Sequence, residues 1–185
     1  MDSMKLKISL LSAATFGRGD GVAGLVDREI EHDANGFPFL RGRTLKGLLA
    51  ESTENIVYAL DRDDKESDWK KAKDALFGKP GRGVKEKGIL VVGDAQLPAS
   101  LRQAVLDAKW SKEDILYSLT SIRRQTSMND HGAPAHASLR SMRVLLPNVV
   151  LESTLYFDGN LEDIHQELLG AAALDLRRAG TGRNR

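Results

Sequence analysis

The sequence predicts a mixed α+β fold in which strands and amphipathic helices alternate along the chain. Two segments, 5–11 and 149–157, alternate apolar and polar residues with the period of a half-buried strand. Two others, 44–60 and 161–176, carry apolar residues at helical spacing. The length of 185 residues is enough for one domain with its own core, so we predict a single domain over 1–185.

Shorter elements are expected between these four segments. We predict a partly helical stretch at 69–77, a strand at 89–92, a helix at 100–109 and a strand at 115–122. Thr44 is the expected N-cap of the first helix, and Asn160 that of the last. The order matches the ferredoxin-like pattern βαββαβ without its last strand. A sheet one strand short leaves a strand edge exposed.

Long insertions separate the elements. Residues 15–43 form a glycine-rich loop, and a loop of that length is often functional. Residues 61–87 are a charged surface segment, 123–143 are a long loop or hairpin tip, and 178–185 are rich in Gly and Arg.

Composition narrows the class of protein. Without cysteine, disulfides and cysteine-based zinc sites are excluded. The absence of cysteine also fits a cytoplasmic location, which we expect. No apolar run approaches the roughly 20 residues that span a bilayer, so we expect no membrane partner. Met1–Leu11 alternates with lysines and Ser9, and we interpret it as a strand rather than a signal peptide.

The net charge of +1 hides a local excess of arginine in two segments. They contain Arg123, Arg124, Arg140 and Arg143, and, near the end, Arg177, Arg178, Arg183 and Arg185. A solvated face explains such clusters, and so does a pair of loops that bind phosphates. The four histidines lack a metal-ligand spacing, and we expect His165 on the surface. Trp69 and Trp110 are expected to pack on helices.

Four motifs occur in a recognisable order. They are Gly36-Phe-Pro-Phe-Leu-Arg-Gly42-Arg-Thr-Leu-Lys46-Gly47, then Leu76-Phe77-Gly78 with Gly88-Ile-Leu-Val-Val-Gly-Asp94-Ala95, then the loop 123–140 before a strand, and Gly180-Thr-Gly182-Arg-Asn-Arg185. This order resembles the RAMP superfamily, and most closely the backbone subunits of type III CRISPR effector complexes. In the first motif, Arg41 stands where the family has proline, and Arg43-Thr44 replace its serine pair.

The resemblance implies a subunit that binds guide RNA beside other effector subunits, including neighbouring RAMP subunits, and that cleaves paired target RNA. Asp27, in Leu25-Val26-Asp27-Arg28, stands where that family has its cleaving aspartate. It would act with a divalent metal, Mg²⁺ or Mn²⁺, or help to activate a 2′-hydroxyl. Asp20 is a rival for this role, whereas Asp33 in Asp33-Ala-Asn35-Gly36 is expected in a turn.

The resemblance also suggests which residues contact RNA through phosphate-binding loops, arginine forks and an apolar wedge in the hairpin. They are Arg18, Gly42, Arg43, Thr44, Lys46, Arg123, Arg124, Met128, Arg140, Gly180, Gly182, Arg183 and Arg185, with Leu139 as a second candidate for the wedge.

Three alternatives remain open from the sequence. The subunit is catalytically inert, or it is a RAMP endoribonuclease that processes guide RNA through a histidine such as His32. A small-molecule enzyme on the same fold would need converging polar residues, and the sequence shows no such set. The stretch 19–24 fits G-x-G-x-x-G, but no helix is predicted after it, which argues against a dinucleotide site.

Overall fold

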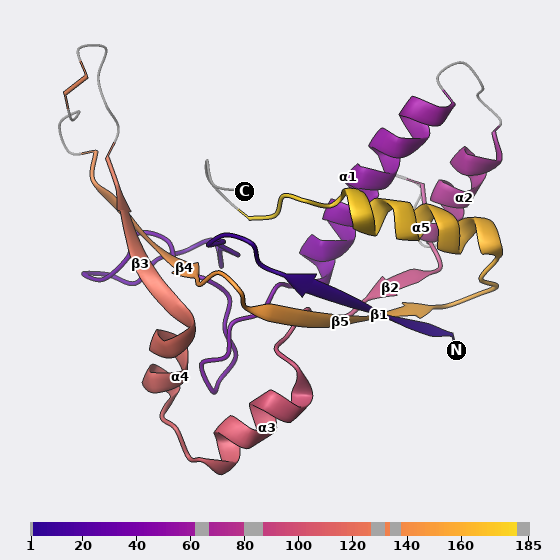
Figure 1. The fold of residues 1–185 in the computed structure, drawn as a ribbon. Coiled ribbons are helices and arrows are strands. Elements are labelled where there is room, and N and C mark those ends of the chain that lie inside the picture. The colour runs from indigo at the N-terminus through magenta and orange to yellow at the C-terminus, as the bar shows by residue number, and fades with distance from the viewer. Residues whose placement is uncertain (1, 62–66, 80–86, 127–131, 134–137, 181–185) are drawn as a thin grey trace. The chain divides into compact units, whose positions relative to one another are not determined.

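The structure is a computed structural model of the 185-residue chain and describes residues 2–61, 67–79, 87–126, 132–133 and 138–180 (Figure 1). Its contacts divide the chain into two compact units, each assembled from segments far apart in sequence. The first unit comprises 1–7, 41–95 and 152–178, and the second comprises 8–40, 96–151 and 179–185. The single domain over 1–185 stays a prediction. None of the described helices has the length and apolar character that crossing a bilayer requires.

The first unit is built on a sheet with the strand order β1-β5-β2, where β1 is Ser3–Ser9, β5 is Val150–Phe157 and β2 is Leu90–Val92. The central strand β5 buries Leu151, Ser153, Leu155 and Phe157, and this confirms the predicted alternation. β2 pairs with β5 antiparallel, with Val91 opposite Tyr156. Among the described residues, β1 is therefore one edge of this sheet.

Three helices form the other half of this unit: α1 (Gly42–Leu60), α2 (Asp68–Phe77) and α5 (Asp163–Asp175). They pack against one another, and α1 also contacts β2. Leu45 and Leu49 of α1 and Leu168 of α5 are almost completely buried. Each contributes about 1.5–3 kcal/mol through burial of its side chain. The mixed composition of strand and helix confirms the predicted α+β class.

The helix ends differ from the prediction. α1 begins at Gly42 with Arg41 as its N-cap, so the assignment of Thr44 as N-cap is wrong. α5 is capped by Glu162 and not by Asn160, because Glu162 and His165 satisfy each other's backbone N–H groups in a capping box. That role buries His165 at 7% exposure, and the expected surface position is wrong.

The second unit contains α3 (Ala99–Asp107), α4 (Lys112–Leu119), β3 (Thr120–Gln125) and β4 (Arg140–Leu145). The strand predicted at 115–122 is wrong over its first part, because residues up to Leu119 belong to α4. Ser111 caps this helix by accepting a hydrogen bond from the Asp114 amide, and this local cap decides between helix and strand for a short apolar run. Trp110 follows α3 and is 52% exposed, so its expected packing on a helix is also wrong.

The hairpin and the long loop complete the second unit. β3 and β4 pair antiparallel from Thr120↔Leu145 to Gln125↔Arg140, which confirms a hairpin within 123–143. The loop is not loose: Phe16, Ile30 and Phe37 are buried in it. Asp33 lies in the predicted turn, where its carboxylate accepts hydrogen bonds from the backbone N–H groups two and four residues later. The loop 15–40 is thus a packed layer that holds fixed positions against the hairpin.

Candidate nucleic-acid interface

Residues 27–29 run beside β4 and make one isolated parallel bridge to it. The Asp27 amide donates to the Ser141 carbonyl at 3.0 Å, and the Arg143 amide donates to the Arg28 carbonyl at 3.0 Å. Arg28 and Met142 form the parallel bridge between these bonds. The loop segment is therefore bonded to β4 in parallel, and Asp27 has a defined neighbour on β4.

The Asp27 carboxylate is held by Ser141. Its Oδ2 accepts a hydrogen bond from the Ser141 amide at 2.6 Å and another from the Ser141 hydroxyl at 3.1 Å. These bonds, the amide first, lower the pKa of Asp27 below its usual value, and the charge of Arg140 adds to the effect. Asp27 is also exposed. A solvent-facing carboxylate that stays ionised is a poor proton acceptor but is well suited to hold a cation.

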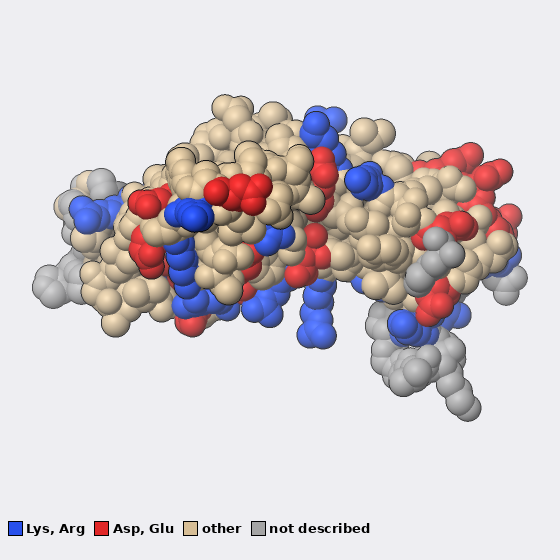
Figure 2. Space-filling view, turned by 90° about the horizontal axis from the view of Figure 1, so that it is seen from below, with Lys and Arg blue, Asp and Glu red and all other residues tan. Residues whose placement is uncertain are grey.

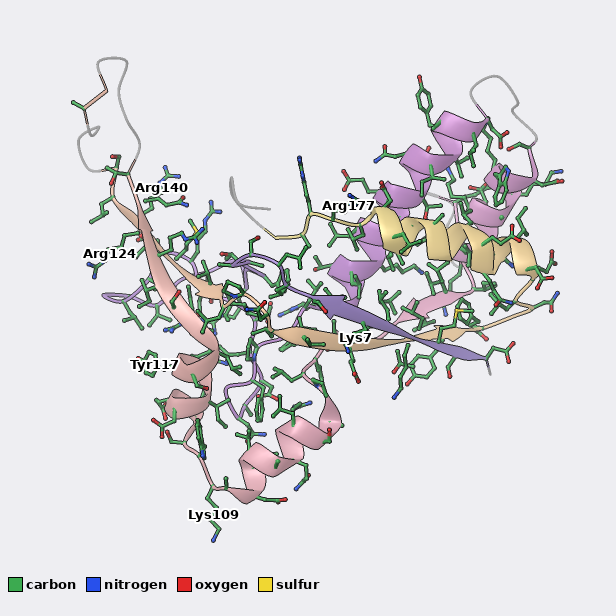
Figure 3. The ribbon with its side chains drawn as sticks, in the orientation of Figure 1. Lys7, Lys109, Tyr117, Arg124, Arg140 and Arg177 are labelled. Atoms are coloured by element: carbon green, nitrogen blue, oxygen red, sulfur yellow. The ribbon has the colours of Figure 1, made fainter. Side chains whose placement is uncertain are left out.

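Three exposed arginines lie next to Asp27 in sequence or on the hairpin. Arg28 follows Asp27 directly, Arg124 is paired with Ser141 across the hairpin, and Arg140 precedes Ser141 on β4. Figure 3 shows Arg124 and Arg140 on the two strands of the hairpin. Within the described part of the chain, none of the three guanidinium groups has an ion pair or hydrogen bond that would occupy it. Exposed guanidinium groups of this kind suit phosphate oxygens.

Arg28 was not predicted as an RNA contact. Its position directly after Asp27 was a signal that could have singled it out. The sequence alone does not show that its side chain is exposed, as it is in the structure. Arg143, which the sequence placed in the arginine cluster but not among the predicted RNA contacts, is buried. It belongs to the same arginine-rich stretch, yet its side chain is 2% exposed and pairs with Glu29 at 2.8 Å. Its guanidinium is therefore not available to phosphates.

The remaining predicted contacts of the second unit are dispersed. Arg18 is bound to Asp20 at 2.6 Å, which raises the pKa of Arg18 and lowers the pKa of Asp20 through this hydrogen bond. Arg123 is half-buried, and Gly180 has φ +114°. Leu139 is 63% exposed. Met128, Gly182, Arg183 and Arg185 lie outside the described residues.

In the first unit, two of the sequence motifs contact each other at the start of α1. The amide of Gly42 donates to the Asp94 carboxylate at 2.7 Å. A Cβ on Gly42 would collide with the carbonyl oxygen of Val92, so only glycine allows α1 to approach the end of β2 this closely. Asp94 supplies the negative charge that a helix N-terminus favours. Arg43 and Thr44 of the first turn are exposed.

Lys46 is engaged with the sheet of its own unit. Its Nζ donates to the Leu90 carbonyl at 2.6 Å. Burial, and secondarily the charge of Lys87, lower the pKa of Lys46. This geometry directs the ammonium toward the backbone of β2. The predicted contacts thus fall into two groups, one with Gly42 in the first unit and one with Asp27 in the second.

Two further properties concern metals and histidines. In the part of the chain that the structure describes, no group of three or more His, Asp or Glu side chains gathers to hold a metal ion. His32, the candidate histidine of the processing alternative, is half-buried, and its Nδ1 lies 3.0 Å from the Asp33 carbonyl oxygen. Figure 2 shows basic and acidic side chains interspersed over one face, in keeping with the near-neutral net charge.

Comparison with solved structures agrees with this fold. One similar chain comes from the "Cryo-EM structure of the Type III-B Cmr-beta bound to cognate target RNA", with a TM-score of 0.64, 9% identity, and 90% of this chain and 87% of that chain covered. Another comes from the "Type III-B Cmr-beta Cryo-EM structure of the Apo state", with a TM-score of 0.62, 11% identity, and 93% and 88% covered. No curated protein matches this sequence.

The fold thus defines an α+β protein of the ferredoxin-like class with long insertions. The family follows from the sequence itself, since the model of the RAMP superfamily matches residues 7–185. The chain belongs to the RAMP superfamily, as its four motifs predicted.

Proposed function

We propose that this chain is an RNA-binding subunit of a type III CRISPR effector complex, which binds guide RNA beside neighbouring RAMP subunits in the cytoplasm and cleaves paired target RNA at Asp27. Membership of the RAMP superfamily supports the proposal, as does the likeness to two Cmr-beta chains, one of them from a complex bound to target RNA. The observation that carries it is the exposed, ionised Asp27 carboxylate next to the arginines of the hairpin.

The chemistry follows from the charges. Arg28, Arg124 and Arg140 would bind phosphates of the guide and target strands and keep the backbone near Asp27. A divalent cation, Mg²⁺ or Mn²⁺, supplies charge neutralisation at the scissile phosphate when bound. Asp27 is the residue of this cluster that would hold such a cation, together with phosphate oxygens of the RNA. Its lowered pKa favours this role over that of a general base.

Cleavage of a labelled target RNA by the assembled complex, with its guide and partner subunits, tests the proposal. Asp27→Asn keeps an oxygen that accepts from Ser141 but removes the charge, so we expect cleavage to fall at least about 100-fold with target binding unchanged. Asp20→Asn is the comparison variant, because Asp20 is an exposed aspartate of the same loop and the rival for this role. Loss of cleavage in Asp20→Asn but not in Asp27→Asn would assign the centre to Asp20. Equal cleavage by the wild type and Asp27→Asn would exclude Asp27 as the centre.

The same experiment separates the alternatives. A complex that binds its target but does not cut it, even with the wild-type chain and either metal, identifies an inert backbone subunit. Cutting of repeat RNA by the isolated chain without metal, and its loss in His32→Ala, would identify the processing enzyme.

A further inference from the structure

We propose that the buried ion pair between Arg143 and Glu29 is a positioning device, which sets the register of residues 27–29 against β4 and so places Asp27 beside Ser141. The part of this inference that concerns cleavage rests on the proposed function. The part that concerns the register does not.

The pair is embedded in the second unit. Arg143 Nε donates to Glu29 Oε1 at 2.8 Å, and both side chains are 2% exposed. A second guanidinium nitrogen donates to the Thr120 hydroxyl at 3.2 Å. The guanidinium also faces an aromatic side chain, with its carbon 5.3 Å from the centre of the Tyr117 ring. The Arg143 side chain of β4 thereby contacts the loop segment 27–29, β3 and α4.

The spacing of the contacts allows the ion pair to fix the register of residues 27–29 against β4. Asp27 and Glu29 are two residues apart, and so are their partners Ser141 and Arg143. Side chains of a strand alternate between faces, so a shift by one residue would turn both acids to the opposite face. A shift by two residues would keep the face but would leave Glu29 or Arg143 buried without its partner. A buried, unpaired charge is strongly unfavourable, and only the observed register avoids it.

Residues 27–29 also make close contacts of a different kind, with residues 18–21 of the same loop. The Glu29 amide donates to the Asp20 carbonyl and the Arg18 amide donates to the Glu29 carbonyl, both at 2.9 Å. A Cβ on Gly21 would lie 2.6 Å from the Asp27 carbonyl oxygen, so this neighbour approaches as backbone alone. Backbone bonds form in any register, whereas the ion pair distinguishes one register from the others. This is the reason to assign the positioning role to Arg143 and Glu29.

The test uses the full chain without RNA and the double variant Glu29→Gln/Arg143→Met. The introduced glutamine keeps an oxygen that can accept from the Ile30 amide, and methionine fills the volume of the arginine stem without a charge. Replacing both partners avoids the unpaired charge that either single change would create. Val144→Ala is the control, since Val144 is a buried, uncharged β4 residue next to Arg143.

The readouts are the pH titration of the Asp27 carboxyl carbon by NMR and the exchange rate of the Ser141 amide proton. In the double variant we expect the pKa of Asp27 to return toward its usual value and the amide to exchange at least about 10-fold faster. Val144→Ala should change neither. A folded double variant with both readouts at wild-type values would overturn the proposal. So would a double variant that fails to fold while Val144→Ala folds, because the pair would then be needed for the fold and not for the register.

Cleavage by the assembled complex adds the second arm. We expect the double variant to lower the cleavage rate at saturating target at least about 10-fold, while the dissociation constant for target RNA stays within about twofold. If the wild-type complex does not cleave RNA, the proposed function fails, and the NMR arm still decides the register claim. If the wild type cleaves and the folded double variant cleaves equally well, the positioning role is overturned.

Discussion

The Asp27 carboxylate accepts a 2.6 Å hydrogen bond from the amide of Ser141, which is 114 residues away in sequence. This contact fastens the glycine-rich loop to β4 near the end of the hairpin where the two strands are connected, since Ser141 is paired with Arg124 and the last pair is Gln125↔Arg140. It also keeps the carboxylate charged at an exposed position beside arginines.

The ionisation of Asp27 should depend on Ser141. The pKa of Asp27 is lowered chiefly by the Ser141 amide and secondly by the Ser141 hydroxyl, so Ser141→Ala should raise it only part of the way to the usual 3.8. Because the folded pKa is lowered, the contact stabilises the protein above pH 3.8 and is lost as the pH falls through the folded pKa. Carbon-detected NMR titration measures this. Asp20 is the internal control, since its pKa depends first on Arg18. An unchanged pKa of Asp27 in Ser141→Ala would contradict the claim that the Ser141 hydroxyl lowers this pKa.

The exposed arginines should account for part of the salt dependence of RNA binding. Arg28→Ala, Arg124→Ala and Arg140→Ala should each weaken RNA binding by the complex, and each should reduce the slope of log affinity against log salt by about 1. Fluorescence anisotropy over a salt series measures the slope. Lys73→Ala removes the same charge from a site already paired with Glu54 and should leave the slope unchanged. Equal slopes for all four variants would show that these arginines do not bind phosphates.

Two glycines of α1 should respond differently to substitution. Gly42→Ala should destabilise the protein by about 1–3 kcal/mol, because its Cβ would collide with the backbone at the end of β2. A Cβ on residue 47 would have no atom within 4 Å, so Gly47→Ala should stabilise the helix by up to about 1 kcal/mol. Chemical denaturation measures both. Similar effects at the two positions would refute the close approach at Gly42.

The cap of α5 should contribute measurably to stability. His165→Ala removes the ring nitrogen Nδ1, which accepts a hydrogen bond from the Glu162 amide at 3.1 Å. The substitution should lower the free energy of unfolding by about 0.5–2 kcal/mol. Gln166→Ala, an exposed change one residue further on, should stay within about 0.5 kcal/mol of the wild type. Thermal and chemical denaturation both report the difference, and equal stabilities would show that the capping box contributes nothing.

Sequence patterns predicted the parts of the fold that depend on local periodicity. The alternation in 149–157 and the helical spacing in 44–60 correspond to β5 and α1, because one face of each element packs on a core. The patterns failed where a short apolar run is compatible with both a helix and a strand. Residues 115–119 form a helix because Ser111 caps it, and a strand preference alone did not reveal this.

The site was predictable only in part. Asp27 was singled out from its place relative to a family motif, and its partner Ser141 is paired with Arg124 and follows Arg140, two arginines suggested by the same resemblance. Its partner Ser141 could not be predicted, since a contact across 114 residues leaves no local signal. The burial of Arg143 was equally hidden, because a charge cluster in sequence does not tell which members find an acid such as Glu29 in the core.

Guide-RNA binding by this chain can be measured by purifying it from its native host with a mild tag and sequencing the RNA that accompanies it. We predict a set of CRISPR-derived guide RNAs in one peak with partner subunits, and a reduced RNA yield when Arg28, Arg124 and Arg140 are all changed to alanine. A monomer free of RNA would be incompatible with a guide-binding subunit of an effector complex.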